Sequence, residues 1–313
     1  MQKISFIFPG QGSQYVGMGK YFYDNFKESR EVFEKANEIL DFNLSEKIFN
    51  GTMDELSETK VTQPSILTVS VAILEAFKSI CDIKPFCTAG LSLGEYSALV
   101  CSNLLDFNQA IPLVQKRAEF MVNSLTGDKY GMTAVIGLSE DKILEAINAV
   151  SDTGKIEIAN YNCPGQIVIS GEACALDKID KLLIDKGALK CVRLSVKAPF
   201  HTSFLSDASE NFKKELMNVD FNKESSIPVI SNVTAEEMDC SQIVDLLSKQ
   251  IMSSVLWEKS VRKMIDMGTE MFVEIGPGKS LTGFMRKIDR KIKVFNIEDQ
   301  ISLDKFLKSL SEV

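Results

Sequence analysis

The stretch Phe86-Cys87-Thr88-Ala89-Gly90-Leu91-Ser92-Leu93-Gly94 decides the fold of this chain. Its first six residues form a short, largely apolar run, which predicts a buried strand. The residues that follow predict a helix to about Cys101. A Gly-x-Ser-x-Gly motif, from Gly90 to Gly94, therefore lies between a strand and a helix, and this context is typical of the strained turn called a nucleophile elbow.

The elbow makes Ser92 the candidate nucleophile. Its glycines allow a tight turn that lifts the serine hydroxyl clear of the sheet. The backbone N–H of Leu93, at the N-terminus of the following helix, would face an oxyanion formed beside that hydroxyl. A chance Gly-x-Ser-x-Gly in an ordinary turn is the alternative, and the strand-turn-helix context favours catalysis over it.

His201 is the only histidine among 313 residues. A serine hydroxyl needs a base, so a mechanism that uses imidazole must use His201, and no multi-histidine metal site can form within the chain. The residue lies in Ala198-Pro199-Phe200-His201-Thr202-Ser203, which predicts a loop just before a helix. A lone histidine is more often structural than catalytic, but a nucleophile elbow elsewhere in the chain makes it the expected base.

The rest of the chain alternates between strand-like and helix-like segments. We expect strands at 4–8, 227–230 and 271–275, helices at 63–80, 106–125, 202–217, 240–252, 258–267 and 279–287, and a final strand-helix pair. Pro64 is expected in the first turn of its helix. The pattern predicts an α/β fold.

The middle of the chain has a pattern of its own. Strands are expected at 132–137, 155–159, 166–170 and 190–195, and helices at 139–150 and 173–186. The order β-α-β-β-α-β is the split βαβ, ferredoxin-like pattern. We therefore expect a small ferredoxin-like subdomain of residues 128–196 inserted into a larger α/β domain of residues 1–127 and 197–313.

Composition excludes several classes of function. Lys plus Arg number 35 and Asp plus Glu 43, a formal charge of -8, so neither nucleic acid nor an anionic membrane is an expected partner. The longest apolar stretch, 64–77, is too short to span a bilayer. Seven cysteines without a Cys-x-x-Cys pair, behind an N-terminus that has no signal-peptide pattern, predict reduced thiols in a cytoplasmic protein.

Three other segments have a structural and a functional interpretation. The loop Phe8-Pro9-Gly10-Gln11-Gly12-Ser13-Gln14 could simply end a strand, or could close backbone and amide donors over the serine; it lacks the Gly-x-Gly-x-x-Gly of a dinucleotide site. Glu274 to Lys279 is expected to be a strand-helix connection. Arg117 in a largely apolar helix would ordinarily be a surface residue with a buried stem, and its functional interpretation is a bidentate clamp for a carboxylate.

Taken together, these segments resemble the malonyl-coenzyme A:acyl carrier protein transacylases. The resemblance covers nearly the whole chain and rests on several motifs in order: Phe8 to Gln14, Val61-Thr62-Gln63-Pro64, Gly90 to Ala98, Arg117, Asn162-Cys163-Pro164-Gly165-Gln166, Phe200-His201, Gln250 and Glu274 to Gly278. It implies an α/β-hydrolase-like core with a ferredoxin-like insert. The family's elbow is most often Gly-His-Ser, whereas Leu91 precedes the serine here.

The resemblance also implies roles for matching residues. Ser92 would be acylated, with His201 as its base and acid, held by a backbone carbonyl at or near Gln250. Gln11 and Leu93 would supply backbone donors to the oxyanion. Arg117 would hold the malonyl carboxylate, and the remaining substrate-binding residues would be Gln63, Asn162 and Phe200.

The function implied is transfer of malonyl from malonyl-CoA to the phosphopantetheine thiol of holo acyl carrier protein, for fatty acid biosynthesis. Coenzyme A would leave, no metal, nucleotide or prosthetic group would be needed, and the chain is expected to be a monomer. Because carrier proteins are usually acidic, docking needs a local basic patch, either near Lys186 and Lys190 or near Arg286 and Lys287.

Three alternatives stay open on the residues alone. A serine hydrolase such as an esterase or phospholipase has the same elbow but no need for a carboxylate clamp. A non-catalytic carrier-binding scaffold has no need for Ser92, His201, Arg117 and Gln11 together. A related acyltransferase could use another acyl group, such as methylmalonyl or acetyl.

Overall fold

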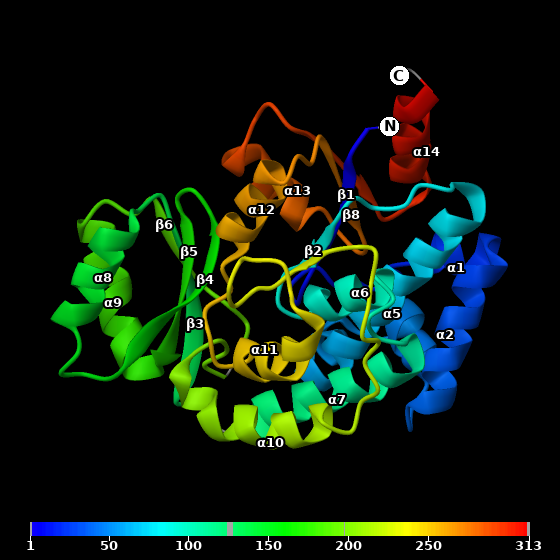
Figure 1. Cartoon of the computed structure of the whole chain (residues 1–313). Coiled ribbons are helices and arrows are strands. Elements are labelled where there is room, and N and C mark those ends of the chain that lie inside the picture. The colour runs from blue at the N-terminus through cyan, green and yellow to red at the C-terminus, as the bar shows by residue number, and fades with distance from the viewer. Residues whose placement is uncertain (1, 124–127, 197, 312–313) are drawn as a thin grey trace.

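A computed structural model describes residues 2–123, 128–196 and 198–311. The predicted helix end at Leu125 and the predicted boundaries at 127/128 and 196/197 fall on or beside residues outside these ranges. Its centre is a parallel sheet of order β7-β2-β1-β8-β9, seen in the middle of Figure 1. The strands are β1 (Ile4–Phe8), β2 (Thr88–Gly90), β7 (Val229–Ile230), β8 (Met271–Ile275) and β9 (Lys293–Ile297).

Both faces of this sheet are covered, as a parallel sheet requires. Successive side chains of β1 point to opposite faces, so Phe6 and Phe8 pack in the cluster that contains α5 (Thr59–Ile80). Ile7 packs instead with Trp257 and Met285, from α12 (Trp257–Asp266) and α13 (Ser280–Ile288). This explains why the strand is apolar at every position except Ser5.

Most predicted elements are present, with some shifts. The helices at the remaining predicted places are α6 (Gly94–Cys101), α7 (Phe107–Asn123), α10 (Ser206–Leu216), α11 (Ile243–Gln250) and α14 (Gln300–Ser311), with 3-10 turns at Ser203–Leu205 and Cys240–Gln242. Helix α5 begins at Thr59, so the expectation that Pro64 lies in the first turn is wrong. As the sixth residue of the helix, Pro64 leaves out one ladder hydrogen bond, and its buried surroundings stabilise the helix instead.

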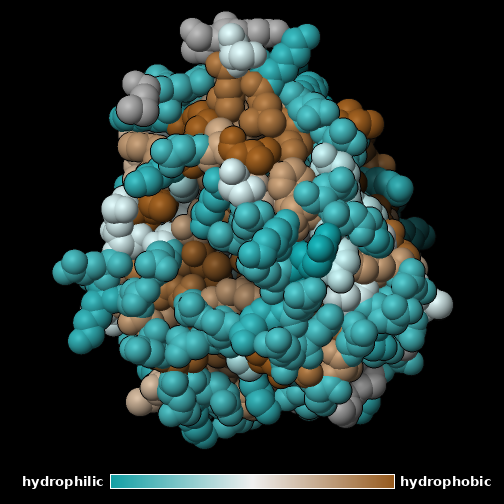
Figure 2. All heavy atoms as spheres, turned by 90° about the vertical axis from the view of Figure 1, so that its right-hand side faces the viewer, coloured by the Kyte–Doolittle hydropathy of each residue, from teal (hydrophilic) through white to brown (hydrophobic). Residues whose placement is uncertain are grey.

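Four helices lie where the sequence analysis assigned nothing. They are α1 (Lys20–Asn25), α2 (Lys27–Ile39), α3 (Leu44–Asn50) and α4 (Met53–Ser57). Helix α2 packs on α5 through Val32, Phe33 and Ala36. Hydrophilic residues cover most of this side of the molecule, and hydrophobic ones gather in the upper part of Figure 2.

A second sheet, antiparallel, stands on the left of Figure 1. Its order is β4-β5-β3-β6, made of β3 (Tyr130–Ile136), β4 (Ile156–Cys163), β5 (Gln166–Glu172) and β6 (Lys190–Arg193). Helices α8 (Glu140–Ala149) and α9 (Ala173–Asp185) pack on it around their own hydrophobic cluster. Strand β4 is longer than predicted, so Asn162 lies in the strand and only Pro164 and Gly165 form the turn, because the cross-strand pairing continues to Cys163 and Gln166.

The sheet order fixes where a site can form. The chain leaves β1 toward β2 on one side and later returns to β8 on the other, so the strand order reverses beside β1. Ligands of open α/β sheets bind outside the carboxyl ends of the strands at such a point.

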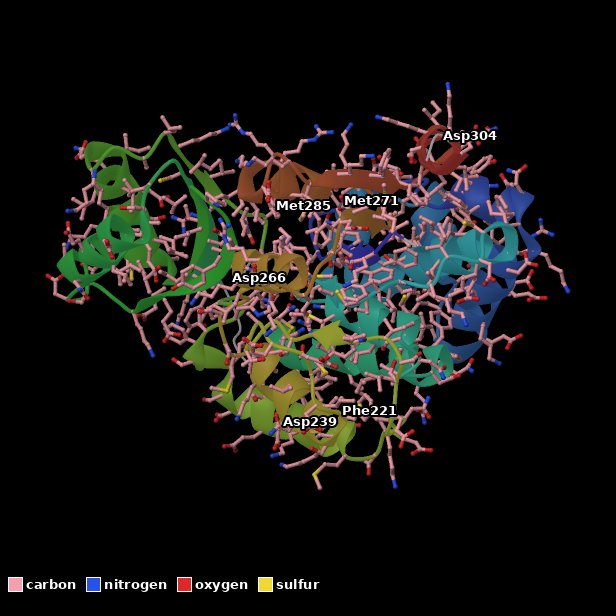
Figure 3. The ribbon with its side chains drawn as sticks, turned by 45° about the horizontal axis from the view of Figure 1, so that its top comes forward. Phe221, Asp239, Asp266, Met271, Met285 and Asp304 are labelled. Atoms are coloured by element: carbon pink, nitrogen blue, oxygen red, sulfur yellow. The ribbon has the colours of Figure 1, made fainter. Side chains whose placement is uncertain are left out.

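Figure 3 labels Met271 on β8 and Met285 on α13, both buried, whereas Asp304 on α14 is exposed. Among the described residues, no helix is both long and apolar enough to cross a bilayer.

Candidate active site

Ser92 lies on a strained turn at the carboxyl end of β2. Its φ is 53°, a left-handed conformation uncommon for a residue with a side chain. A Cβ added to Gly90 would come within 1.9 Å of the Gly94 carbonyl, and one added to Gly94 within 2.1 Å of the Phe8 carbonyl oxygen. The two glycines of the motif are therefore required by close backbone approach, as expected of a nucleophile elbow.

His201 faces this serine. Its Nε2 lies 2.7 Å from Ser92 Oγ, and its Nδ1 lies 2.8 Å from the carbonyl oxygen of Gln250. Because a carbonyl only accepts, Nδ1 carries the proton and Nε2 is free to accept one from the serine. Burial, and then the charge of Arg117, lower the pKa of His201 to about 4. The imidazole is therefore neutral at pH 7. It is also more deeply buried than its place in a loop suggests.

Arg117 is fully buried, so the ordinary interpretation of a surface arginine is wrong. Helix α7 turns it inward, where Nη1 donates to Gln63 Oε1 at 2.7 Å. Nη2 donates to Ser92 Oγ at 3.0 Å and to Gln250 Oε1 at 2.8 Å. A guanidinium thus lies in direct contact with the serine hydroxyl.

Two residues that the sequence analysis missed complete this network. Asn232 lies just after β7 and accepts from the Ser92 backbone N–H through Oδ1 at 2.6 Å. Glu95, the second residue of α6, accepts from the Asn232 N–H at 2.8 Å and from Gln250 Nε2. Desolvation raises the pKa of Glu95 to about 7, against the opposing effect of its donors and of Arg117. A single acid in an otherwise apolar helix was the signal available for it.

The predicted oxyanion donors, Gln11 and Leu93, line a cavity whose wall also includes Ser92. The Gln11 side chain points away to Thr59 Oγ1, at 3.3 Å. Within the described ranges, no hydrogen bond from the backbone N–H of Gln11 or of Leu93 is found, so both remain available to a ligand.

The cavity has a volume of about 260 Å3 and contains every predicted substrate-binding residue. Those residues are Arg117, Gln63, Asn162 and Phe200. Asn162 Oδ1 is buried and has no partner among the residues described. Ser280, Leu281 and Phe284 of α13 form another part of the wall, which the sequence analysis did not anticipate.

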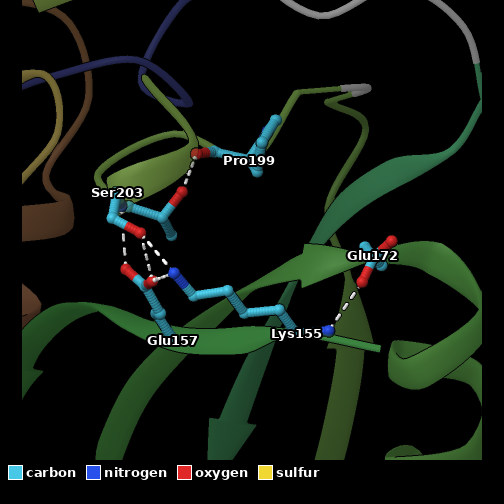
Figure 4. A network of polar contacts seen from close by, with 6 residues as sticks. Lys155, Glu157, Glu172, Pro199 and Ser203 are labelled. Carbon is cyan, nitrogen blue, oxygen red and sulfur yellow. Dashed lines mark hydrogen bonds and ion pairs between the residues drawn. The ribbon is translucent and has the colours of Figure 1, made fainter. Parts of the chain in front are cut away.

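Strand β4 ties the His201 loop to the second sheet. The Glu157 carboxylate accepts from the backbone N–H of Ser203 at 2.8 Å, from its hydroxyl at 2.5 Å and from Lys155 Nζ at 2.6 Å, as Figure 4 shows. On the other side, the Val255 N–H donates to the Ala159 carbonyl at 2.8 Å. The loop that carries His201 and the segment after Gln250 are thus both held by one strand.

The chain is similar to known proteins over nearly its whole length. Residues 5–299 match the family described as the acyl transferase domain. The chain is 40% identical over 314 residues to malonyl CoA-acyl carrier protein transacylase of Bacillus subtilis (strain 168), covering 100% of this chain and 98% of the relative. It is similar to the crystal structure of malonyl CoA-acyl carrier protein transacylase from Clostridium perfringens, with a TM-score of 0.94 and 43% identity over 99% of this chain and 98% of that one.

A further similar structure contains a partner. It is a malonyl-transacylase in complex with a type II PKS acyl-carrier protein, with a TM-score of 0.95 and 32% identity over 98% of this chain and 100% of that one. The similarity therefore extends over the whole chain rather than over a single motif.

Proposed function

The chain belongs to the malonyl CoA-acyl carrier protein transacylase family, and we propose on that premise that it transfers malonyl from malonyl-CoA to holo acyl carrier protein. It is then an acyltransferase that supplies the extender unit of fatty acid biosynthesis. We infer a cytoplasmic location, which the seven free thiols support, and a monomeric state.

The first half-reaction loads the serine. His201 Nε2 takes the hydroxyl proton as Ser92 Oγ attacks the thioester carbon of malonyl-CoA, and the backbone N–H groups of Gln11 and Leu93 stabilise the oxyanion. When the C–S bond breaks, His201 returns the proton to the sulfur and coenzyme A leaves as a thiol. The product is a malonyl ester of Ser92.

The second half-reaction reverses these steps with another thiol. The phosphopantetheine thiol of the carrier protein gives its proton to His201 and attacks the ester carbonyl. The C–O bond breaks, and His201 protonates Ser92 Oγ. One base therefore serves both halves, which requires the neutral Nε2 that the Gln250 carbonyl enforces.

The observation that carries the proposal is the 3.0 Å contact between Arg117 Nη2 and Ser92 Oγ. A buried guanidinium at the nucleophile suits an acyl group that ends in a carboxylate, because it can pair with both oxygens. A serine hydrolase acting on neutral esters would have no use for this charge. Gln63, Asn162 and Phe200 line the same space and are proposed to hold the rest of the malonyl thioester.

We also infer the finer architecture. The parallel sheet with its elbow is proposed to be an α/β-hydrolase-like core of residues 1–127 and 197–313. Residues 128–196 are proposed to form a ferredoxin-like subdomain, supported by the β-α-β-β-α-β sequence of elements and the order β4-β5-β3-β6.

The carrier protein is proposed to dock on α13. Arg286, Lys287 and Arg290 are exposed on or just after this helix, and among the described residues none of the three has an ion-pair partner within 4.0 Å. The same helix lines the cavity through Leu281 and Phe284. The other predicted patch is weaker, because Lys186 pairs with Glu145 at 2.9 Å.

Intact-protein mass spectrometry tests the function. The protein is incubated with malonyl-, acetyl- or methylmalonyl-CoA, and holo carrier protein is then added. We expect one malonyl group on Ser92, its removal by the carrier thiol, and no label on Ser92→Ala. Malonyl lost to water instead of the carrier would indicate a hydrolase, and a label that persists in Ser92→Ala would exclude Ser92 as the nucleophile.

A further inference from the structure

We propose that Glu95 is a positioning residue for the transfer reaction, acting through Asn232 and Gln250 to hold the nucleophile, the base and the carboxylate clamp in one geometry. The inference rests on the proposed function, because it concerns the selectivity of that same site. Glu95 lines no part of the cavity and is 1% exposed, so any effect on substrate must pass through other residues.

One oxygen of the Glu95 carboxylate holds the elbow through Asn232. An Oε atom accepts the Asn232 backbone N–H at 2.8 Å. The Asn232 amide then spans the turn: Oδ1 accepts from the Ser92 N–H at 2.6 Å, and Nδ2 donates to the Gly90 carbonyl at 2.7 Å. The Asn232 side chain is thus bonded to the strained Ser92 and to Gly90 before it, and the Glu95 carboxylate holds the Asn232 backbone.

The other oxygen of Glu95 holds Gln250, which contacts both Arg117 and His201. Gln250 Nε2 donates to the second Glu95 oxygen and also to the Ser92 carbonyl, at 2.8 Å. Both protons of the amide nitrogen are therefore used. Its oxygen must then face Arg117, which it reaches at 2.8 Å from Nη2, and the backbone carbonyl of Gln250 holds His201.

The charges of Glu95 and Arg117 are consistent with this arrangement. Each oxygen of Glu95 accepts from an N–H group, and the ionised form, which predominates above the raised pKa of about 7, only accepts hydrogen bonds. Glu95 therefore selects the amide nitrogen of Gln250 and leaves the amide oxygen for the cation. In that form, Glu95 and Arg117 are opposite charges at the two ends of one buried amide. A buried charge needs such compensation, and the Gln250 amide transmits it without placing the carboxylate where it would repel a malonyl group.

Glu95→Gln is the direct test, because it keeps the shape and replaces one of the two acceptor oxygens by an NH2 donor. Asn232 N–H and Gln250 Nε2 donate to different oxygens of Glu95, so in this variant one of the two donors faces another donor. The Gln250 amide is therefore expected to lose its orientation toward Arg117. In single-turnover acylation of Ser92 we expect the malonyl rate to fall about 10- to 100-fold and the acetyl rate to fall less, so that the malonyl-to-acetyl preference decreases. Parallel losses, or an unchanged preference, would overturn the inference.

A double-mutant cycle checks the route. If Glu95 acts on the preference through Arg117, then Glu95→Gln in an Arg117→Ala background lowers it no further. Additive losses of preference would show that Glu95 does not act through the clamp. Should Glu95→Gln fail to fold, Gln250→Met tests the same link: it keeps the backbone carbonyl for His201 and removes the amide, and a preference that survives this change would refute the proposal.

Glu274→Gln is the matched control. Glu274 is also a buried carboxylate that accepts two backbone N–H groups, those of Leu281 and Thr282 at 3.1 and 2.7 Å, and it makes no contact with Gln250. It should lose thermal stability but keep the malonyl-to-acetyl preference; an equal loss of preference would assign the Glu95 effect to general destabilisation. Failure of the proposed function is separate, because the wild-type protein would then not transfer malonyl to the carrier.

Discussion

His201 is the only imidazole of the chain, so its protonation can be followed directly. Burial and the neighbouring Arg117 lower its pKa to about 4, below the usual 6.5. The lowered value keeps the neutral base populated above about pH 4. In a proton NMR titration, the ring signal of His201 is therefore expected to stay constant from pH 8 to pH 5.5, where an ordinary histidine would already be mostly charged.

The same signal in Arg117→Ala provides a comparison. Loss of the cation should raise the midpoint, while burial keeps it below 6.5. His201→Ala itself should slow acylation by about 10²–10⁴-fold, the usual effect of a positioned base. A midpoint near 6.5 in the wild-type protein would mean that the imidazole is not enclosed as described.

The effect of removing Arg117 distinguishes a malonyl transferase from a general esterase. Truncating one partner of a buried charge pair costs about 3–5 kcal/mol, so Arg117→Ala should lower the malonyl-to-acetyl preference by about 10²–10⁴-fold. Arg117→Lys should restore only part of it, since an ammonium cannot pair with both carboxylate oxygens. Single-turnover acylation with both donors measures this. Equal losses for malonyl and acetyl would make Arg117 structural.

The proposed catalytic residues could be predicted because each has a distinctive place in the sequence. A Gly-x-Ser-x-Gly between a strand and a helix singled out Ser92, and the histidine count left only His201. Glu95 and Asn232 could not be found in this way. Their proposed role depends on contacts between residues 137 positions apart, as in the bond from the Asn232 N–H to Glu95, and nothing in the local sequence marks such a pair.

The elements show where local pattern is too short to be informative. Helices α1, α3 and α4 have 6, 7 and 5 residues, lengths that are marginal without tertiary packing. Helix α2, with 13 residues and a buried stripe through Val32, Phe33 and Ala36, had a pattern that could have been used. Strand β4 was predicted too short because polar Asn160 and Asn162 interrupt its apolar pattern, and these are the β4 residues that line the cavity.

The two hydrogen bonds by which Glu157 of β4 holds Ser203 in the His201 loop can be tested. We call this pair of bonds the β4 clamp. In Glu157→Ala, Ser203 loses two hydrogen bonds, so the base should be held less firmly and Ser92 acylation should slow by about 3- to 10-fold. The malonyl-to-acetyl preference should not change, because Arg117 takes no part in this clamp. Glu172→Ala is the control: it accepts from the Lys155 N–H at 2.6 Å and does not touch the loop. Equal effects of the two variants would contradict a specific role for Glu157.

The strand order of the parallel sheet could not be predicted from the residue pattern. Alternating strands and helices indicated an α/β fold, but the order β7-β2-β1-β8-β9 depends on which strands pair over separations of more than 260 residues, such as Ile4 with Met271. That order places the loops after β1, β2 and β7 together, and so assembles the site. It also brings α13 to the cavity, which no sequence motif suggested.

The position of α13 leads to a prediction about the acidic partner. A chain of net charge -8 repels an acidic carrier protein in general, so binding must depend on a local patch of opposite charge. Arg286, Lys287 and Arg290 form such a patch on the helix whose Leu281 and Phe284 reach the cavity. A carrier bound there could insert its phosphopantetheine arm along the same helix toward Ser92.

Charge reversal on this helix should separate loading from transfer. In the double variant Arg286→Glu and Lys287→Glu, kcat/KM for the carrier protein should fall about 10- to 100-fold at low salt, and less at high salt, where the wild-type attraction is screened. Loading is measured with malonyl-pantetheine, which lacks the phosphates of coenzyme A, and should be retained because Ser92, His201 and Arg117 are untouched. Lys186→Glu with Lys190→Glu makes the same change of charge on the other predicted patch, so a larger loss in that control would place the carrier there instead.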